Sequence, residues 1–212
     1  MKFLKDPVSG LTHLFGAAVS IAGLVVLVRT GVANRDVWQT ASFAVFGASL
    51  ILLYLASATY HLLRVPARVE VVLRKIDHIM IFVLIAGTYT PVCLTALRGT
   101  LGYAMLVLVW ALATAGAVLK LFFLKWPRWV YTGVYLGLGW LAVTLTGPLL
   151  RAAGWAPVLG LLAGGVFYSA GAVIYGLKRP NPLPGVFGFH EIFHVFIILG
   201  SVSHFVFVMM LA

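Results

Sequence analysis

The sequence predicts an all-α integral membrane protein in which residues 1–212 form one domain, a bundle of seven transmembrane helices. Composition is the first observation: 62% of the 212 residues are hydrophobic and only 9% are charged, whereas a soluble domain carries roughly 25% charged residues. The mean hydropathy of +1.07 agrees with this class. The second observation is that apolar runs of about twenty residues, the length that crosses a bilayer, recur along the chain.

Seven such runs are separated by short gaps with turn residues, for example Arg98-Gly99-Thr100 and Pro180-Asn181-Pro182. The spans are expected near Ser9–Val28, Val37–Leu63, Asp77–Leu97, Leu101–Leu121, Trp129–Leu150, Ala156–Leu177 and Gly188–Leu211. The gaps leave no room for a soluble domain, and an odd number of spans places the two termini on opposite sides. Glycines four residues apart, Gly133/Gly137 and Gly160/Gly164, allow close helix contacts, although ordinary packing is the preferred interpretation of both pairs.

The first apolar run has an alternative interpretation as a cleaved signal peptide. Lys2 and Lys5 precede it, and Gly31-Val32-Ala33 resembles a cleavage site. However, Asp6 and Pro7 interrupt the basic region, and the run has the length of a span. We therefore expect it to be retained as the first helix.

Basic residues are divided unevenly between the two ends of the predicted bundle, and the net charge is +10. Because they lie in short loops between apolar runs, we attribute them to membrane topology and exclude nucleic-acid binding. One end carries eleven: Lys2, Lys5, Arg64, Arg68, Arg74, Lys75, Lys120, Lys125, Arg128, Lys178 and Arg179. The other end carries four: Arg29, Arg35, Arg98 and Arg151. The positive-inside rule places the first end, and with it the N-terminus, in the cytoplasm.

Four ionisable residues are predicted to lie at one depth near the cytoplasmic surface. His61 ends the second span, Asp77 begins the third, and His190 and His194 lie in the first turns of the seventh. All four are within about two or three helical turns of the same surface. Ionisable groups inside a membrane are costly and are candidates for function. For a single histidine, the alternative is a hydrogen bond to a neighbouring helix.

The spacing of these residues favours a metal site. His190 and His194 are four apart and share a helix face, as do Ser57 and His61. Three histidine nitrogens and one water form the open tetrahedral site typical of catalytic zinc. The expected zinc ligands are His61, His190 and His194. Asp77 would accept a hydrogen bond from the water, and Ser57 would orient the water or a substrate carbonyl.

Three further histidines lie in the spans. His13 is at the depth of the site and is a candidate to support the ligands from outside. His204 is ten residues beyond His194, roughly 15 Å deeper at about 1.5 Å per residue, and is expected to form an interhelical hydrogen bond. His78 is rotated by about 100° from Asp77 and is expected to face a neighbouring helix or the headgroup region.

The segment His190-Glu191-Ile192-Phe193-His194 matches the HExxH pattern of zinc metalloproteases, but its context differs. A metzincin requires Gly and His where this chain has Ile197 and Gly200. No acidic residue follows Glu191 to serve as the third ligand of other such proteases. The third ligand is therefore expected upstream, at His61. Glu191 is either an interfacial carboxylate or a base.

Five motifs carry a resemblance to a known family. They are Leu11-Thr12-His13-Leu14-Phe15-Gly16, Ser57-Ala58-Thr59-Tyr60-His61, Lys75-Ile76-Asp77-His78, Ala86-Gly87-Thr88-Tyr89-Thr90-Pro91 and His190-x-x-x-His194. With these motifs the chain resembles, over nearly its whole length, the haemolysin III branch of the progestin and adipoQ receptor (PAQR) family. The resemblance implies seven helices and a cytoplasmic-side zinc held by His61, His190 and His194. Asp77 and Ser57 would surround its bound water.

Wider relatives of this family include alkaline ceramidases, and its animal members are receptors with ceramidase-type activity. The chain lacks the receptors' long cytoplasmic N-terminal region, so a hormone-receptor role is not expected. Its size and loops resemble bacterial members. The expected location is the bacterial inner membrane, which the chain crosses several times.

Two functions follow as alternatives. The first is a zinc-dependent hydrolase of a lipid amide or ester, with a membrane lipid as partner and no protein partner identified. The second is a non-enzymatic membrane protein, either cytolytic and pore-related or a sensor or receptor of membrane homeostasis, in which zinc is structural. Asp77 discriminates between them, because a structural zinc has four protein ligands whereas a catalytic zinc keeps a water.

Overall fold

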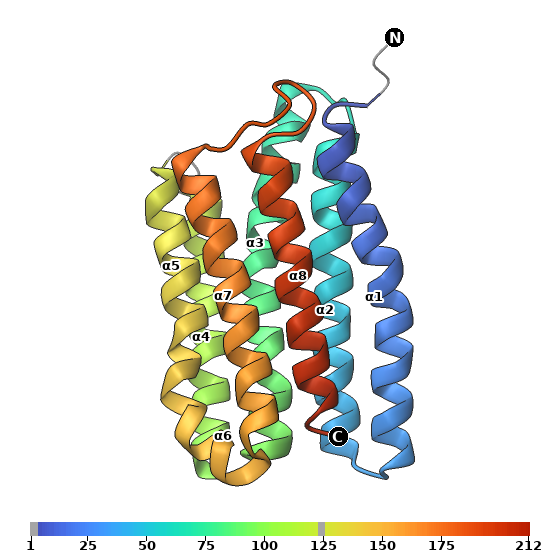
Figure 1. Ribbon diagram of the computed structural model, residues 1–212, viewed down its shortest axis with the longest axis vertical. Coiled ribbons are helices and arrows are strands. Elements are labelled where there is room, and N and C mark those ends of the chain that lie inside the picture. Colours follow the sequence, from blue (N-terminus) through green and yellow to red (C-terminus); the bar gives the residue numbers. More distant parts are fainter. Residues whose placement is uncertain (1–3, 123–125) are drawn as a thin grey trace.

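The computed structural model describes residues 4–122 and 126–212, which form a bundle of seven long apolar helical spans (Figure 1). The helices are α1 (Pro7–Ala33), α2 (Val37–Leu62), α3 (Ala67–Pro91), α4 (Thr100–Phe122), α5 (Arg128–Trp140), α6 (Thr146–Ala153), α7 (Trp155–Leu177) and α8 (Phe189–Met209). A π-helical segment, Val92–Ala96, extends α3, and a 3₁₀ segment, Leu141–Leu145, joins α5 to α6 into one span. The predicted seven-helix membrane bundle is confirmed.

The charge asymmetry corresponds to the two ends of this bundle. We call the end at which α1, α3, α5 and α8 begin the basic end; α8 finishes at the opposite end (Figure 1). Of the eleven basic residues assigned to it, Lys2 and Lys125 lie outside the described residues. The predicted placement of the two ends of the chain on opposite sides therefore agrees with the helix order.

The predicted start of the third span, at Asp77, is wrong by ten residues. Helix α3 begins at Ala67, directly after Pro66, whose carbonyl accepts hydrogen bonds from the amides of Val69 (2.9 Å) and Glu70 (3.0 Å). Hydropathy indicates where a helix enters the apolar layer. Proline indicates where a helix begins, because its fixed φ and missing amide hydrogen are compatible with a helix start and not with a helix interior. Asp77 is consequently in the third turn of a helix that extends beyond the apolar run.

The fifth span is interrupted, which the sequence interpretation did not anticipate. The hydroxyl of Tyr89 on α3 donates to the carbonyls of Leu138 (2.8 Å) and Gly139 (2.9 Å), near the end of α5. Pro148, in the first turn of α6, has no amide hydrogen to donate to the preceding turn. The backbone between these two points, Leu141–Leu145, adopts the tighter 3₁₀ form.

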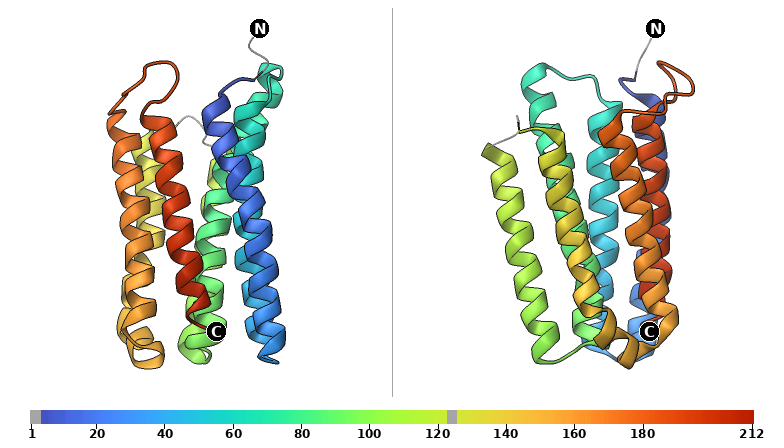
Figure 2. Two further views of the ribbon diagram at one scale, coloured as in Figure 1. Left: turned by 45° about the vertical axis from the view of Figure 1, so that its right-hand side comes forward. Right: turned by 60° about the vertical axis from the view of Figure 1, so that its left-hand side comes forward.

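Packing brings the ends of three helices together at the basic end. Helix α1 lies along α2, α7 lies along α8, and α8 also contacts α1, whereas α4 stands beside α3 at the edge of the bundle (Figure 2). Large buried side chains fill the space between helices, among them Phe43, Phe46, Tyr54, Phe82 and Phe207. This arrangement sets the last turn of α2 against the first turns of α1 and α8.

The two glycine pairs behave differently. A Cβ atom at Gly164 on α7 would lie 2.1 Å from Cδ2 of His204 on α8, and one at Gly160 would lie 3.1 Å from Cβ of Phe207. Gly160 and Gly164 therefore allow the close α7–α8 contact. Apart from the backbone of their own helix and their chain neighbours, no described atom lies within 4 Å of the Cβ position at Gly133 or Gly137, so this pair makes no close helix contact.

The Gly164→Ala variant should be destabilised, because the new methyl group displaces the His204 ring. Overpacking of this kind costs about 1–3 kcal/mol. The matched control is Gly137→Ala, which meets open space and gains helix propensity of up to about 1 kcal/mol. Thermal unfolding in mild detergent measures both, and an unchanged melting temperature for Gly164→Ala would contradict the packing described here.

The charge asymmetry predicts that the basic end faces the cytoplasm. A reporter fused before Met1 should then be cytoplasmic, and one fused after Ala212 should be on the other side of the membrane. A pair such as alkaline phosphatase and green fluorescent protein, active on opposite sides, measures this. Two fusions reporting the same side would contradict the seven-span topology.

Candidate metal centre

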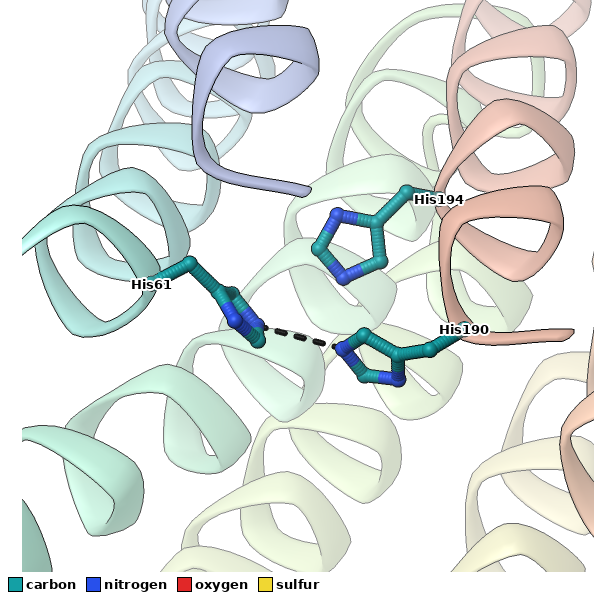
Figure 3. Close-up of side chains that lie close together, drawn as sticks. All are labelled: His61, His190 and His194. Carbon is teal, nitrogen blue, oxygen red and sulfur yellow. Dashed lines mark hydrogen bonds between the residues drawn. The ribbon is translucent and has the colours of Figure 1, made fainter. Parts of the chain in front are cut away.

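Three histidines from two helices meet at the basic end. His61 lies in the last turn of α2, and His190 and His194 lie in the first two turns of α8. One ring nitrogen of each lies within 4.8 Å of the others, and Nε2 of His61 is 3.3 Å from Nε2 of His190 (Figure 3). His61 and His194 are buried. This buried group could hold a metal ion, and the predicted convergence of the three imidazoles is confirmed.

Two of these imidazoles are oriented by the beginning of α1. Nδ1 of His61 is 3.1 Å from Oδ2 of Asp6, and Nδ1 of His194 is 3.2 Å from the carbonyl oxygen of Ser9. A carbonyl and an ionised carboxylate only accept hydrogen bonds, so Nδ1–H is the donor in both pairs. Nε2 of each ring is therefore left with its lone pair available. This is the arrangement that metal-binding histidines show, and the donor set fits a metal ion.

Glu191, the acidic residue of the HExxH match, ties α1 to α8. Its Oε1 accepts a hydrogen bond from the Ser9 hydroxyl at 2.8 Å, and its Oε2 accepts one from the amide of Gly188 at 2.8 Å. The second bond caps the first turn of α8. Both carboxylate oxygens have structural partners, which favours the interfacial interpretation of Glu191 over that of a base.

His13 on α1 packs directly against the histidine group. Its ring is stacked on that of His194, with centroids 3.8 Å apart and planes at 15°, and meets Tyr54 edge-on at 5.0 Å. Both His13 ring nitrogens are buried and have no hydrogen-bond partner among the described residues. His13 thus limits the movement of the His194 ring. This position fits the prediction that His13 supports the metal ligands from outside.

The histidines open into a cavity of about 600 Å³. Each site residue named from the sequence lines it: His13, Ser57, His61, Asp77, His190, Glu191 and His194. The Asp77 carboxylate interacts with the Ser57 side chain and with the charges of Lys120 and Arg74. The structure therefore brings a carboxylate and a hydroxyl to the same cavity as the three imidazoles.

The two remaining histidines have different outcomes. Nε2 of His204 is 3.1 Å from the carbonyl oxygen of Leu161 on α7, which confirms the predicted interhelical hydrogen bond. His78 donates from Nδ1 to the carbonyl of Arg74 at 2.6 Å and lines the cavity. His78 therefore lies at a cavity that several neighbouring helices also line, and its expected orientation towards a helix or the headgroup region stays a prediction.

Several residues at the site were not identified from the sequence. Asp6 was considered only as an interruption of a basic segment, and Ser9 only as the start of a span. A signal for Asp6 did exist: a carboxylate directly before the first span lies at the same end as His61 and His194. Ser9 acts through its backbone carbonyl as well as its hydroxyl, and no residue pattern reports a backbone contact.

Comparisons with known proteins agree with this architecture. Residues 1–205 match the family model described as Haemolysin-III related. The chain is 39% identical to "Hemolysin-3 homolog" of Bacillus subtilis (strain 168) over 201 residues, 95% of this chain and 91% of that protein. It is 36% identical to "Hemolysin-3" of Bacillus cereus over 205 residues, 96% of this chain and 90% of that protein.

A more distant similarity extends to animals. The chain is 23% identical to "Monocyte to macrophage differentiation factor" of Homo sapiens over 198 residues, which are 92% of this chain and 79% of that protein. The family model spans almost the whole bundle, including the histidines of α2 and α8. The chain therefore belongs to the haemolysin III family, as its motifs predicted.

Proposed function

We propose that this protein is a zinc-dependent hydrolase that cleaves an amide or ester bond of a membrane lipid at the cytoplasmic side of a bacterial inner membrane. The observation that carries the proposal is the orientation of the histidines. Their Nδ1 atoms are hydrogen-bonded to α1 in two of three cases, and the group opens into a cavity that also holds a carboxylate. Imidazole ligands suit zinc among several transition metals.

The residues that would hold zinc are His61, His190 and His194. When bound at such a site, zinc polarises a carbonyl and makes water a nucleophile at neutral pH. Asp6 and the carbonyl of Ser9 hold two of the ligand rings in one tautomer. Fixing the rings in advance lowers the entropic cost of binding the ion.

Asp77 is proposed as the group that moves the proton. In hydrolysis, a water oxygen bonds to the substrate carbonyl carbon, and the bond from that carbon to nitrogen or oxygen breaks. Asp77 accepts the proton released by the water and returns it to the departing amine or alkoxide, so that protons balance. Ser57 interacts with the Asp77 carboxylate, and both residues line the cavity.

The rest of the cavity suits an acyl chain. Its volume of about 600 Å³ is in the range of small-molecule sites, roughly 300–1,000 Å³. Apolar side chains from α2, α3, α7 and α8 line it, including Leu53, Leu84, Ile85, Leu161 and Ile197. An acyl chain lying along these residues would bring its carbonyl towards the histidines at the basic end.

A second candidate is a non-enzymatic membrane protein in which the metal joins helices. Two observations favour it: the histidines come from α2 and α8 and are tied to α1, and the printed names of two relatives are "Hemolysin-3 homolog" and "Hemolysin-3". In this case Asp77 would be a fourth ligand. The two candidates predict different behaviour for Asp77 variants.

Purified protein should contain about one zinc ion per chain, because the described residues form one such histidine group. The double variant His61→Ala/His194→Ala should contain almost none. The matched control is His204→Ala, which removes an imidazole from α8 outside this group and should keep the metal. Elemental analysis in mild detergent decides, and a double variant that retains a full equivalent would rule the site out.

Asp77→Asn should retain most of its zinc and its melting temperature but lose lipid hydrolysis, because the amide keeps the shape and removes the basic group. His190→Ala should lose zinc and stability together, because it deletes a ligand. Changes outside the ligand set weaken metal affinity or activity by about 10- to 100-fold. Zinc content, thermal unfolding, and fatty acid released from a panel of acylated lipids provide the three readouts. Complete loss of zinc from Asp77→Asn would instead support the structural-metal candidate.

A further inference from the structure

Three cationic side chains line the same cavity on the side formed by α3, α4 and α5. They are Arg74, Lys120 and Arg128, which we call the basic cluster. Arg74 lies one turn before Asp77 on α3, Lys120 lies near the end of α4, and Arg128 begins α5. Three helices thus each contribute one cation at the basic end of the bundle.

Shared neighbours place these cations around one volume. Lys120 interacts electrostatically with both Arg74 and Asp77. Arg74 and Arg128 both act on Tyr175 of α7, which lines the same cavity. The three members of the basic cluster therefore line one cavity together with Asp77 and Tyr175, and the Arg128 guanidinium lies 5.0 Å from the centroid of the Tyr175 ring.

Lys120 is the least expected member, because it is only 3% exposed. A lysine two residues from a helix end can normally extend its ammonium group to water at the membrane surface. Here the ammonium nitrogen instead lies 3.3 Å from the centroid of the Tyr131 ring, inside the bundle. A buried cation at this depth is costly and is therefore a candidate for function.

The carboxylates of the cavity do not neutralise the basic cluster. Among residues 4–122 and 126–212, none of its members forms an ion pair within 4.0 Å of a carboxylate. Asp6 is directed to His61, and Glu191 is directed to Ser9 and Gly188. Asp77 is the remaining cavity carboxylate, so three positive charges face one negative charge.

Charges that served only to set topology would not need to line the cavity. Arg68 provides the contrast: like Arg74 and Arg128 it is exposed, but it is absent from the cavity lining. A cluster of two guanidinium groups and one ammonium matches a phosphate, which carries up to two charges and accepts several hydrogen bonds. Apolar side chains line the rest of the same cavity.

We infer that the basic cluster is a headgroup subsite and that the lipid bound in the cavity is an acyl lipid with a phosphate-bearing headgroup. The phosphate contacts Arg74, Lys120 and Arg128, while the acyl chain follows the apolar wall. The inference rests on the proposed function, because it names the class of substrate for the same cavity. The inference also predicts an affinity for a phosphate-bearing lipid, which can be measured without any hydrolysis.

The test uses an ether-linked lysophosphatidate, which has a phosphate and an alkyl chain but no carbonyl to hydrolyse. The full chain in dodecyl maltoside micelles, which contain no phosphate, should bind it at least about tenfold more tightly than the matching uncharged alkylglycerol. Lys120→Met and Arg128→Gln should each weaken binding about tenfold, the effect of one charge-assisted hydrogen bond. Arg68→Gln, which removes a charge outside the cavity, should leave binding unchanged.

Competition identifies the chemistry of the ligand. Inorganic phosphate and oleate should each compete poorly with the ether lipid, because one lacks the chain and the other lacks the phosphate. Equal competition by inorganic phosphate would show a free-anion site, and equal competition by oleate would show a carboxylate site. Either result overturns the inference. The inference is also overturned if Arg68→Gln weakens binding of the ether lipid as much as Lys120→Met does.

The outcome is separable from that of the proposed function. Zinc content and melting temperature of Lys120→Met and Arg128→Gln should match the unaltered protein. If Lys120→Met does not fold, Arg128→Gln carries the test, because Arg128 is exposed. Hydrolysis of neutral acyl lipids without preferential binding of the phosphorylated probe would refute the subsite alone. The opposite outcome is that Lys120→Met and Arg128→Gln weaken binding of the probe although the unaltered chain hydrolyses no lipid. That outcome would refute the hydrolase and leave the headgroup subsite in place.

Discussion

The site depends on the hydrogen bonds between the beginning of α1 and the histidines of α2 and α8. Asp6 holds Nδ1 of His61, and the carbonyl of Ser9 holds Nδ1 of His194. In an apolar bundle, a buried polar group without a partner costs several kcal/mol. These bonds therefore fix the relative position of three helix ends and, at the same time, direct two Nε2 atoms to one point.

The cavity has two chemically different walls. The wall formed by α1, α2 and α8 carries the three imidazoles of the candidate metal centre, and the wall formed by α3, α4 and α5 carries the basic cluster. Asp77 lies on α3 and interacts with both Ser57 of α2 and Lys120 of α4. The carboxylate for which we propose proton transfer thus interacts with both walls, which suits the proposed substrate, whose carbonyl and headgroup are near each other.

Most of the fold followed from hydropathy, because each span must satisfy its own backbone inside the bilayer. Departures occur where local chemistry outweighs hydropathy. Pro66 starts α3 ten residues before the apolar run, and the Tyr89 hydroxyl with Pro148 interrupts the fifth span. Gly164 packs on His204 whereas Gly137 meets nothing, although both belong to the same spacing pattern.

The sequence by itself determined the seven spans, and it placed His61, His190 and His194 at one end of the bundle, because span length and charge set the depth of each residue. It also paired His190 with His194, since helical spacing sets which residues share a face. Only the tertiary structure decided that Asp6 and Ser9 orient the imidazoles and that Lys120 turns inward. These contacts depend on the rotation and lateral order of the helices, which side-chain packing sets and hydropathy does not encode.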